Sequence, residues 1–164
     1  MQIRFRHLAM LAALAVAFQA AQAQDAKSLV KKELPLKVEI EAAQAAIDAC
    51  TAKKVSVHVF ILDAEGNVRL LLIPDTAHWD TLDGARRKGY TAFKTGEPTI
   101  NLMKRRGDVP STLPKDPYMV FLGGAVPIKI GNELIGVLSA GGGAPEQDAE
   151  CAQAGADKIQ PYLK

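Results

Sequence analysis

Residues 55–67 read Val-Ser-Val-His-Val-Phe-Ile-Leu-Asp-Ala-Glu-Gly-Asn, and this stretch decides the fold class. Apolar residues alternate with other residues along 55–61, and a period of two predicts a strand. The turn-forming residues 63–67 lead directly into a second apolar run at 68–73. Because two strands joined by so short a turn pair in antiparallel fashion, we predict a β-hairpin here.

Helical patterns flank this hairpin on both sides. Apolar residues recur at intervals of three and four along 36–53, and Asp80 is a candidate N-cap for a second helix. Pro98 is placed to open a short third helix that stops at Gly107. Helices are thus predicted at 36–53, 80–94, 98–107 and 145–164. Further strands are predicted at 118–130, with a break at Gly123 and Gly124, and at 133–140.

This order of elements defines the predicted architecture. Tight turns make the strands antiparallel, so we predict an α+β fold in which a sheet of about five strands is flanked by helices. The N-terminal and C-terminal helices should be the longest. No linker interrupts residues 35–164, which we expect to form a single domain after a polar lead-in at 24–34.

The first 23 residues have the pattern of a secretory signal peptide. Arg4 and Arg6 precede an apolar run at 8–18, and the small-residue site Ala21-Gln22-Ala23 follows. The apolar run spans only about 16 Å as a helix, against ~30 Å for a hydrocarbon core, so the alternative of a permanent anchor is disfavoured. We therefore predict cleavage after Ala23 and a mature protein that is periplasmic or secreted.

Cleavage changes the charge of the protein. It removes two basic residues and no acidic one, so the 20 basic residues of the precursor fall to equal its 18 acidic residues. A mature domain with no net charge and no basic stripe predicts no nucleic-acid partner. No second apolar stretch of membrane length follows residue 23, so we expect no membrane insertion after cleavage.

Cys50 and Cys151 are the two cysteines of the chain. In an oxidising compartment they could form a disulfide, or they could remain small buried thiols on apolar helix faces. Sequence spacing does not show whether they are close, so both alternatives stay open.

Several motifs follow one another in a fixed order between residues 36 and 160. They lie at 57–67, 75–77, 85–92, 98–102, 121–128, 135–142 and 146–148. Together they resemble the GlcG/HbpS-like family, whose members are described as haem-binding or haem-degrading domains. The chain departs from the family pattern at Thr76, where Gly is usual, at Thr81, where Ser is usual, and at Ala125, which replaces a third Gly.

The resemblance carries expectations about structure and ligand. It implies an antiparallel sheet flanked by helices, a homo-oligomer, and the binding of haem or a related tetrapyrrole, as in some members of the family. It also marks Lys88 as the family's basic position on the second helix, where an ammonium could hold a haem propionate. The alternative is that Lys88 lies on a solvated helix face.

Haem iron takes an axial imidazole, thioether, thiolate or phenolate. The two histidines of the mature chain, His78 and His58, are therefore the leading candidates for an axial ligand. His78 stands beside Trp79 in a loop, and His58 should lie on the sheet face opposite the Val57 side chain, where a ligand or second subunit could cover it. The alternatives are a solvated His78 and an interface His58. The remaining iron-ligand candidates are Met103, Met119, Tyr90 and Tyr118, together with Cys50 and Cys151 if they are reduced.

Other polar residues complete the candidate site. Asp75, Thr91 and Tyr118 join His78, His58 and Lys88 as predicted cofactor-binding residues. Residues 141–143 are glycines before a helix start, which we interpret as a tight turn rather than an anion-binding nest. Glu146, in the first turn of that helix, could pair with Lys88 or act on a ligand, and these two are the candidate catalytic groups.

Three functions remain open at this point. The leading hypothesis is a periplasmic binding protein for haem or a related tetrapyrrole. The first alternative is an enzyme that degrades haem or acts on a small carboxylate, with Lys88 and Glu146 as site groups. The second is a non-catalytic sensory or interaction module that docks another periplasmic protein.

Overall fold

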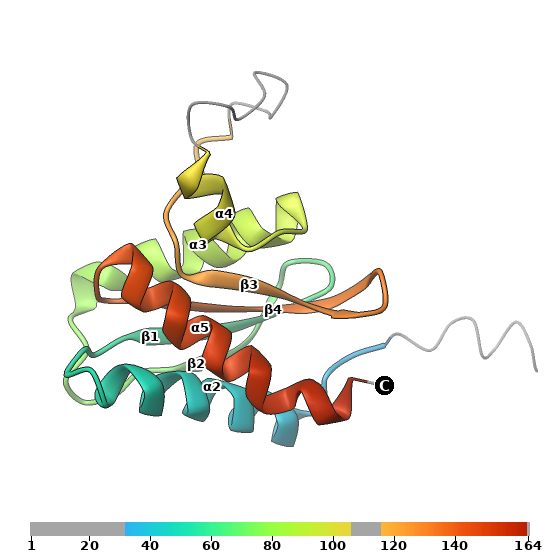
Figure 1. The fold of residues 1–164 in the computed structure, drawn as a ribbon, viewed down its shortest axis with the longest axis horizontal. Coiled ribbons are helices and arrows are strands. Elements are labelled where there is room, and N and C mark those ends of the chain that lie inside the picture. The colour runs from blue at the N-terminus through green and yellow to red at the C-terminus, as the bar shows by residue number, and fades with distance from the viewer. Residues whose placement is uncertain (1–31, 106–115, 164) are drawn as a thin grey trace, which may run out of the picture. The chain divides into compact units, whose positions relative to one another are not determined.

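Two helix layers enclose one antiparallel sheet (Figure 1). The computed structural model describes residues 32–105 and 116–163. The predicted signal peptide, residues 24–31 of the lead-in, and the predicted helix end at Gly107 lie outside these ranges. The helices are α2 Leu36–Thr51, η1 Trp79–Thr81, α3 Leu82–Thr95, α4 Thr99–Lys104, α5 Pro145–Ile159 and η2 Gln160–Tyr162. The strands are β1 His58–Asp63, β2 Val68–Leu72, β3 Ala125–Ile130 and β4 Glu133–Gly141.

The sheet has the strand order β2-β1-β4-β3, with every neighbouring pair antiparallel. The α+β prediction is confirmed, including the long first and last helices, but the sheet has four strands rather than about five. Residues 118–124 form no strand. Their backbone is held by a helix instead, because the N–H of Val120 donates to Oγ1 of Thr91 in α3 at 2.9 Å.

The two faces of the sheet carry separate cores. Val59 and Ile61 of β1 pack in the larger core with α2 and α5, whereas Phe60 and Leu62 pack with Ala85 of α3. The period of two predicted for this strand is therefore confirmed, since alternate side chains enter opposite layers. Figure 1 shows α2 and α5 covering one face of the sheet and α3 the other.

A disulfide joins the two helices of the larger layer. Cys50, near the end of α2, is bonded to Cys151 of α5 with a Cα–Cα distance of 5.5 Å, which settles the alternatives left open by the sequence. The helices also approach closely at Gly155, where a Cβ would lie 2.6 Å from the Ala42 carbonyl oxygen. A glycine at this position allows the backbones of α2 and α5 to touch.

The start of α3 differs from its prediction. Asp80 was expected as the N-cap, but a 3₁₀ turn over Trp79–Thr81 precedes the helix and Thr81 occupies the cap position. The Thr81 hydroxyl is used within this turn, since it donates to the His78 carbonyl at 2.9 Å. The turn therefore fixes the position of the His78 loop relative to α3.

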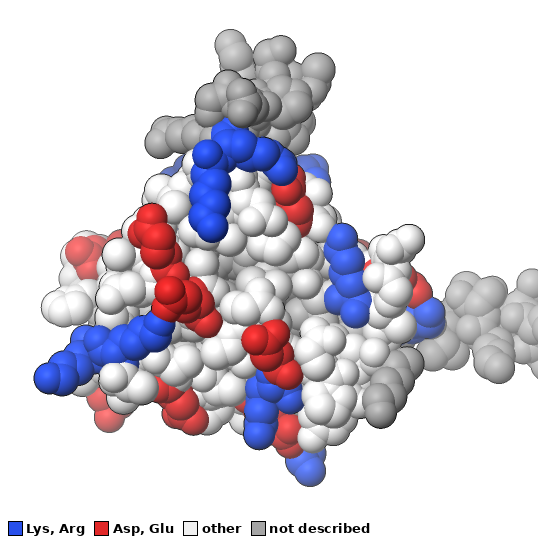
Figure 2. Space-filling model, in the orientation of Figure 1, with Lys and Arg blue, Asp and Glu red and all other residues white. Residues whose placement is uncertain are grey.

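Charged residues are mixed in sign on the face where α5 lies. Figure 2 shows basic and acidic side chains interspersed there and separated by uncharged surface, with no continuous basic stripe on the described residues of this face. In the described ranges, no helix combines the length and the apolar character needed to cross a membrane.

Candidate functional site

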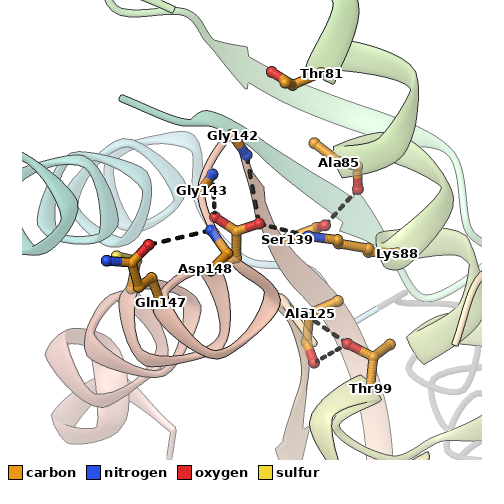
Figure 3. Close-up of polar contacts among 12 residues, drawn as sticks. Thr81, Ala85, Lys88, Thr99, Ala125, Ser139, Gly142, Gly143, Gln147 and Asp148 are labelled. Atoms are coloured by element: carbon orange, nitrogen blue, oxygen red, sulfur yellow. Dashed lines mark hydrogen bonds and ion pairs between the residues drawn. The ribbon is translucent and has the colours of Figure 1, made fainter. Parts of the chain in front are cut away.

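A buried ion pair lies at the junction of α3, β4 and α5 (Figure 3). Nζ of Lys88 is 2.6 Å from Oδ2 of Asp148, and the Asp148 side chain is fully buried. The turn after β4 closes on the same carboxylate, because the N–H of Gly143 donates to Oδ1 at 2.9 Å and that of Gly142 lies 3.4 Å from Oδ2. One carboxylate thus holds a lysine from α3 and the glycine turn together.

This geometry explains the run of glycines. The N–H groups of Gly142 and Gly143 point inward to Asp148, so the turn provides no open nest for an external anion. A Cβ on Gly142 would overlap the Ser56 carbonyl oxygen, and one on Gly141 would lie 2.7 Å from Cβ of Ala85. The glycines therefore serve close backbone packing, as the tight-turn interpretation held.

The pairing of Lys88 with Glu146 does not form. Glu146 is exposed, and Asp148 takes the lysine instead. The reason is helical geometry, because Asp148 shares the buried face of α5 with Cys151 and Gly155 while Glu146 does not. The spacing of three and seven residues between these positions was the signal that could have identified Asp148. Because Lys88 is buried and paired with Asp148, its ammonium group is not available at the surface.

His58 is buried on the side of the sheet that α3 covers, with only 2% of its surface exposed. It does lie on the predicted face, but η1 and α3 of the same chain cover it. Its Nδ1 is 3.1 Å from Oγ1 of Thr81. Burial lowers the pKa of His58, although a hydrogen bond with the Gly141 backbone and the charge of Asp80 act in the opposite direction.

His78 is exposed and lines a surface cavity of about 540 Å³. The cavity wall is formed by Thr51, Lys54, Val55, Ser56, Thr76, His78, Gly142 and Gly143. Its two glycines are those held by Asp148, so the buried ion pair supports one wall of the cavity. Trp79, beside His78, is 86% exposed and presents an apolar ring to solvent.

The other predicted site residues lie elsewhere. Asp75 lines a separate cavity of about 360 Å³ with residues of α2 and β2, and Tyr118 lines a third with residues of α3. Thr91 is fully buried and bonded to the backbone of Arg87 and Val120. Met119 is also buried. None of these residues lines the cavity at His78.

The lining of the His78 cavity is mostly polar, with Val55 as its one large apolar side chain, but three groups at or beside it have chemistry that a haem could use. An exposed imidazole can ligate iron, the Lys54 ammonium can pair with a propionate, and a neighbouring indole can cover part of a flat ring. The described residues hold no cluster of three or more His, Cys, Asp or Glu side chains that could bind a metal ion directly.

Fold and site together define a class of protein: an α+β domain with helices on both faces of an antiparallel sheet and one accessible imidazole at a surface cavity. The family model described as "Haem degrading protein HbpS-like" matches residues 34–157. The chain belongs to this HbpS-like family.

Solved structures agree with this assignment. A double mutant of Streptomyces reticuli HbpS is 31% identical, with a TM-score of 0.71, over 78% of this chain and 88% of the other. A PduOC:heme complex is 25% identical, with a TM-score of 0.70, over 79% of this chain and 96% of the other. Klebsiella pneumoniae protein ORFY has the same fold at 23% identity, with a TM-score of 0.70, over 79% and 93% of the two chains. No curated protein matches the chain.

Proposed function

We propose that this protein binds haem or a related tetrapyrrole in the cavity at His78. The observation that carries the proposal is the position of His78, an exposed imidazole at the wall of a cavity of about 540 Å³. This volume lies within the ~300–1,000 Å³ range of small-molecule sites. Membership of the HbpS-like family and the haem complex of PduOC support the same ligand.

Each group at the cavity has a distinct role in this proposal. His78 ligates the iron, and Lys54 pairs with a propionate at the cavity wall. In this proposal His58 does not ligate the iron, because it is only 2% exposed and Thr81 of η1 lies 3.1 Å from its Nδ1. Lys88, proposed from sequence as the propionate anchor, instead acts through Asp148, which orients the glycine wall.

A hemin titration of the mature protein tests the proposal. Micromolar protein should produce a shifted, saturable Soret band at about one hemin per protomer. Lys54→Gln should weaken the binding of hemin. Lys129→Gln should not, because Nζ of Lys129 donates a hydrogen bond to the Gly96 carbonyl and does not line the cavity. Absence of any Soret shift at micromolar protein would remove haem as the ligand.

We further propose that the protein is exported and acts in the periplasm or outside the cell. The disulfide supports this, because such bonds persist in oxidising compartments and are rare in the cytosol. Cell fractionation followed by N-terminal sequencing should place the mature protein outside the cytoplasm with Gln24 as its first residue. A cytoplasmic protein that keeps residues 1–23 would contradict it.

Haem degradation is the second candidate function, favoured by the description of the family model. With a reductant and oxygen, an enzyme would bleach bound haem and release iron even when catalase removes free peroxide. Bleaching that catalase abolishes would identify coupled oxidation, and the protein would then be a binding protein only. Glu146→Gln tests the exposed carboxylate proposed from sequence as a site acid.

We also propose self-association through the outer side of α2. Leu36 and Ile40 share one helix face and are 56% and 44% exposed. Tyr162 is also exposed, and its hydroxyl donates a hydrogen bond to Glu41, the residue next to Ile40. Light scattering on the eluted protein should give a mass above one chain, and Ile40→Lys should reduce it. A monomeric wild-type protein would exclude this surface as an interface.

A further inference from the structure

The cavity lined by Tyr118 lies on the opposite side of α3 from the buried core, between that helix and residues 116–118. Its volume is about 290 Å³, and its lining residues are Arg86, Arg87, Tyr90 and Tyr118. Arg86 and Tyr90 are four residues apart and therefore share one face of the helix. Two guanidinium groups and two phenol rings thus converge on one small space.

The cavity wall is held in place by polar contacts. Nε and Nη2 of Arg87 donate to the carbonyl oxygens of Tyr118 and Pro117 at 3.2 and 2.7 Å. The Tyr90 hydroxyl donates to Asp116 at 2.7 Å, which lowers the pKa of the Asp116 carboxyl and raises that of the phenol. The segment at 116–118 is therefore clamped to α3 without any ligand.

The charges at this cavity leave capacity for an anion. Both acceptors of Arg87 are neutral carbonyls, and among the described residues its nearest carboxylate oxygen, on Asp83, lies 3.9 Å away. Asp83 also pairs with Arg86 at 3.2 Å, so one carboxylate faces two guanidinium groups. Asp116, the other carboxylate nearby, accepts the Tyr90 hydroxyl and the Tyr118 N–H.

The walls add a preference for a flat ring. The rings of Tyr90 and Tyr118 meet edge to face, with centroids 6.3 Å apart, and Tyr118 is 59% exposed. Aromatic faces bind flat conjugated groups, and guanidinium groups bind carboxylates with two hydrogen bonds. The volume lies just below the ~300–1,000 Å³ range of small-molecule sites, so it favours a small ring or the edge of a larger one.

We propose that Arg86, Arg87, Tyr90 and Tyr118 form a second binding site, distinct from the His78 cavity, for a carboxylate attached to a flat conjugated ring. The carboxylate contacts Arg86 and Nη1 of Arg87, whose partner Asp83 is 3.9 Å away, and the ring lies against the tyrosines. Two sources share this chemistry: a free aromatic acid, or the propionate edge of a tetrapyrrole.

Calorimetric titration of the mature protein with benzoate tests the site. We expect saturable binding that acetate, which lacks the ring, and benzyl alcohol, which lacks the charge, do not match. Arg86→Gln should weaken benzoate binding about fivefold or more, because it removes a charged donor. Arg105→Gln is the matched control, since Arg105 is similarly exposed and paired with one carboxylate, Glu97.

Hemin distinguishes the two sources. If Arg86→Gln weakens hemin but not hemin dimethyl ester, the site takes a propionate edge; if hemin is unaffected while benzoate binds, it takes a free acid. Loss of hemin binding in His78→Ala with benzoate binding retained would confirm that the two sites are separate. No saturable benzoate binding at millimolar concentration, together with hemin binding unchanged by Arg86→Gln, would overturn the proposal.

Discussion

Removing the disulfide should cost a large share of the stability of this domain. Cys50 and Cys151 are 101 residues apart in sequence, and both are fully buried between α2 and α5. For a closed loop of that length, the chain-entropy relation gives about 4.7 kcal/mol, and removal of native disulfides from small secreted domains typically costs about 2–5 kcal/mol. We expect the Cys50→Ala/Cys151→Ala variant to lose about 3–5 kcal/mol of unfolding free energy.

Urea unfolding followed by far-ultraviolet circular dichroism measures this loss. The denaturant slope m should rise in the double variant, because the unfolded chain without its cross-link exposes more surface. Under dithiothreitol the wild-type protein should approach the variant, which controls for the effect of the substitutions themselves. A loss below about 1 kcal/mol with an unchanged m would refute the view that the cross-link limits the unfolded chain.

Three other perturbations address the buried contacts. Lys88→Met should lower the free energy of unfolding by about 3–5 kcal/mol, because it leaves the Asp148 carboxylate buried without its cation. In urea unfolding, the double variant Lys88→Met/Asp148→Asn should lose less stability than the sum of the two single variants. Folding lowers the pKa of His58, so the unfolded chain binds a proton more readily than the folded one. Stability should therefore fall as the pH decreases through 6.5 toward the lowered pKa. His58→Gln should flatten this part of a plot of Tm against pH. Gly155→Ala should cost about 1–3 kcal/mol in thermal unfolding, because the added Cβ would crowd the Ala42 carbonyl.

Local sequence patterns predicted most of the fold for identifiable reasons. The alternation along 55–61 reflects a strand with a core on each face, so Val59 and Phe60 enter different layers. Tight turns then required antiparallel neighbours. The strand prediction was wrong for residues 118–124, although their composition is typical of strands. These residues pack on α3 instead, and Thr91 accepts the hydrogen bond that a neighbouring strand would otherwise accept.

The candidate site was harder to predict because its contacts are distant in sequence. Lys88 was identified, but its partner Asp148 is 60 residues away and is selected by the packing of α5 on the sheet. For the same reason the sequence left the cysteine pairing open. The sequence also could not show that His58 is buried and His78 is exposed. This difference arises because η1 covers His58 and leaves His78 open to solvent.

The role of His78 is the central claim, and an imidazole rescue tests it most directly. Hemin titration of His78→Gly should show a weakened or displaced Soret band, and added imidazole should restore the wild-type spectrum by replacing the missing side chain. A His78→Gly variant that binds hemin with the wild-type spectrum and affinity, without imidazole, would contradict the account.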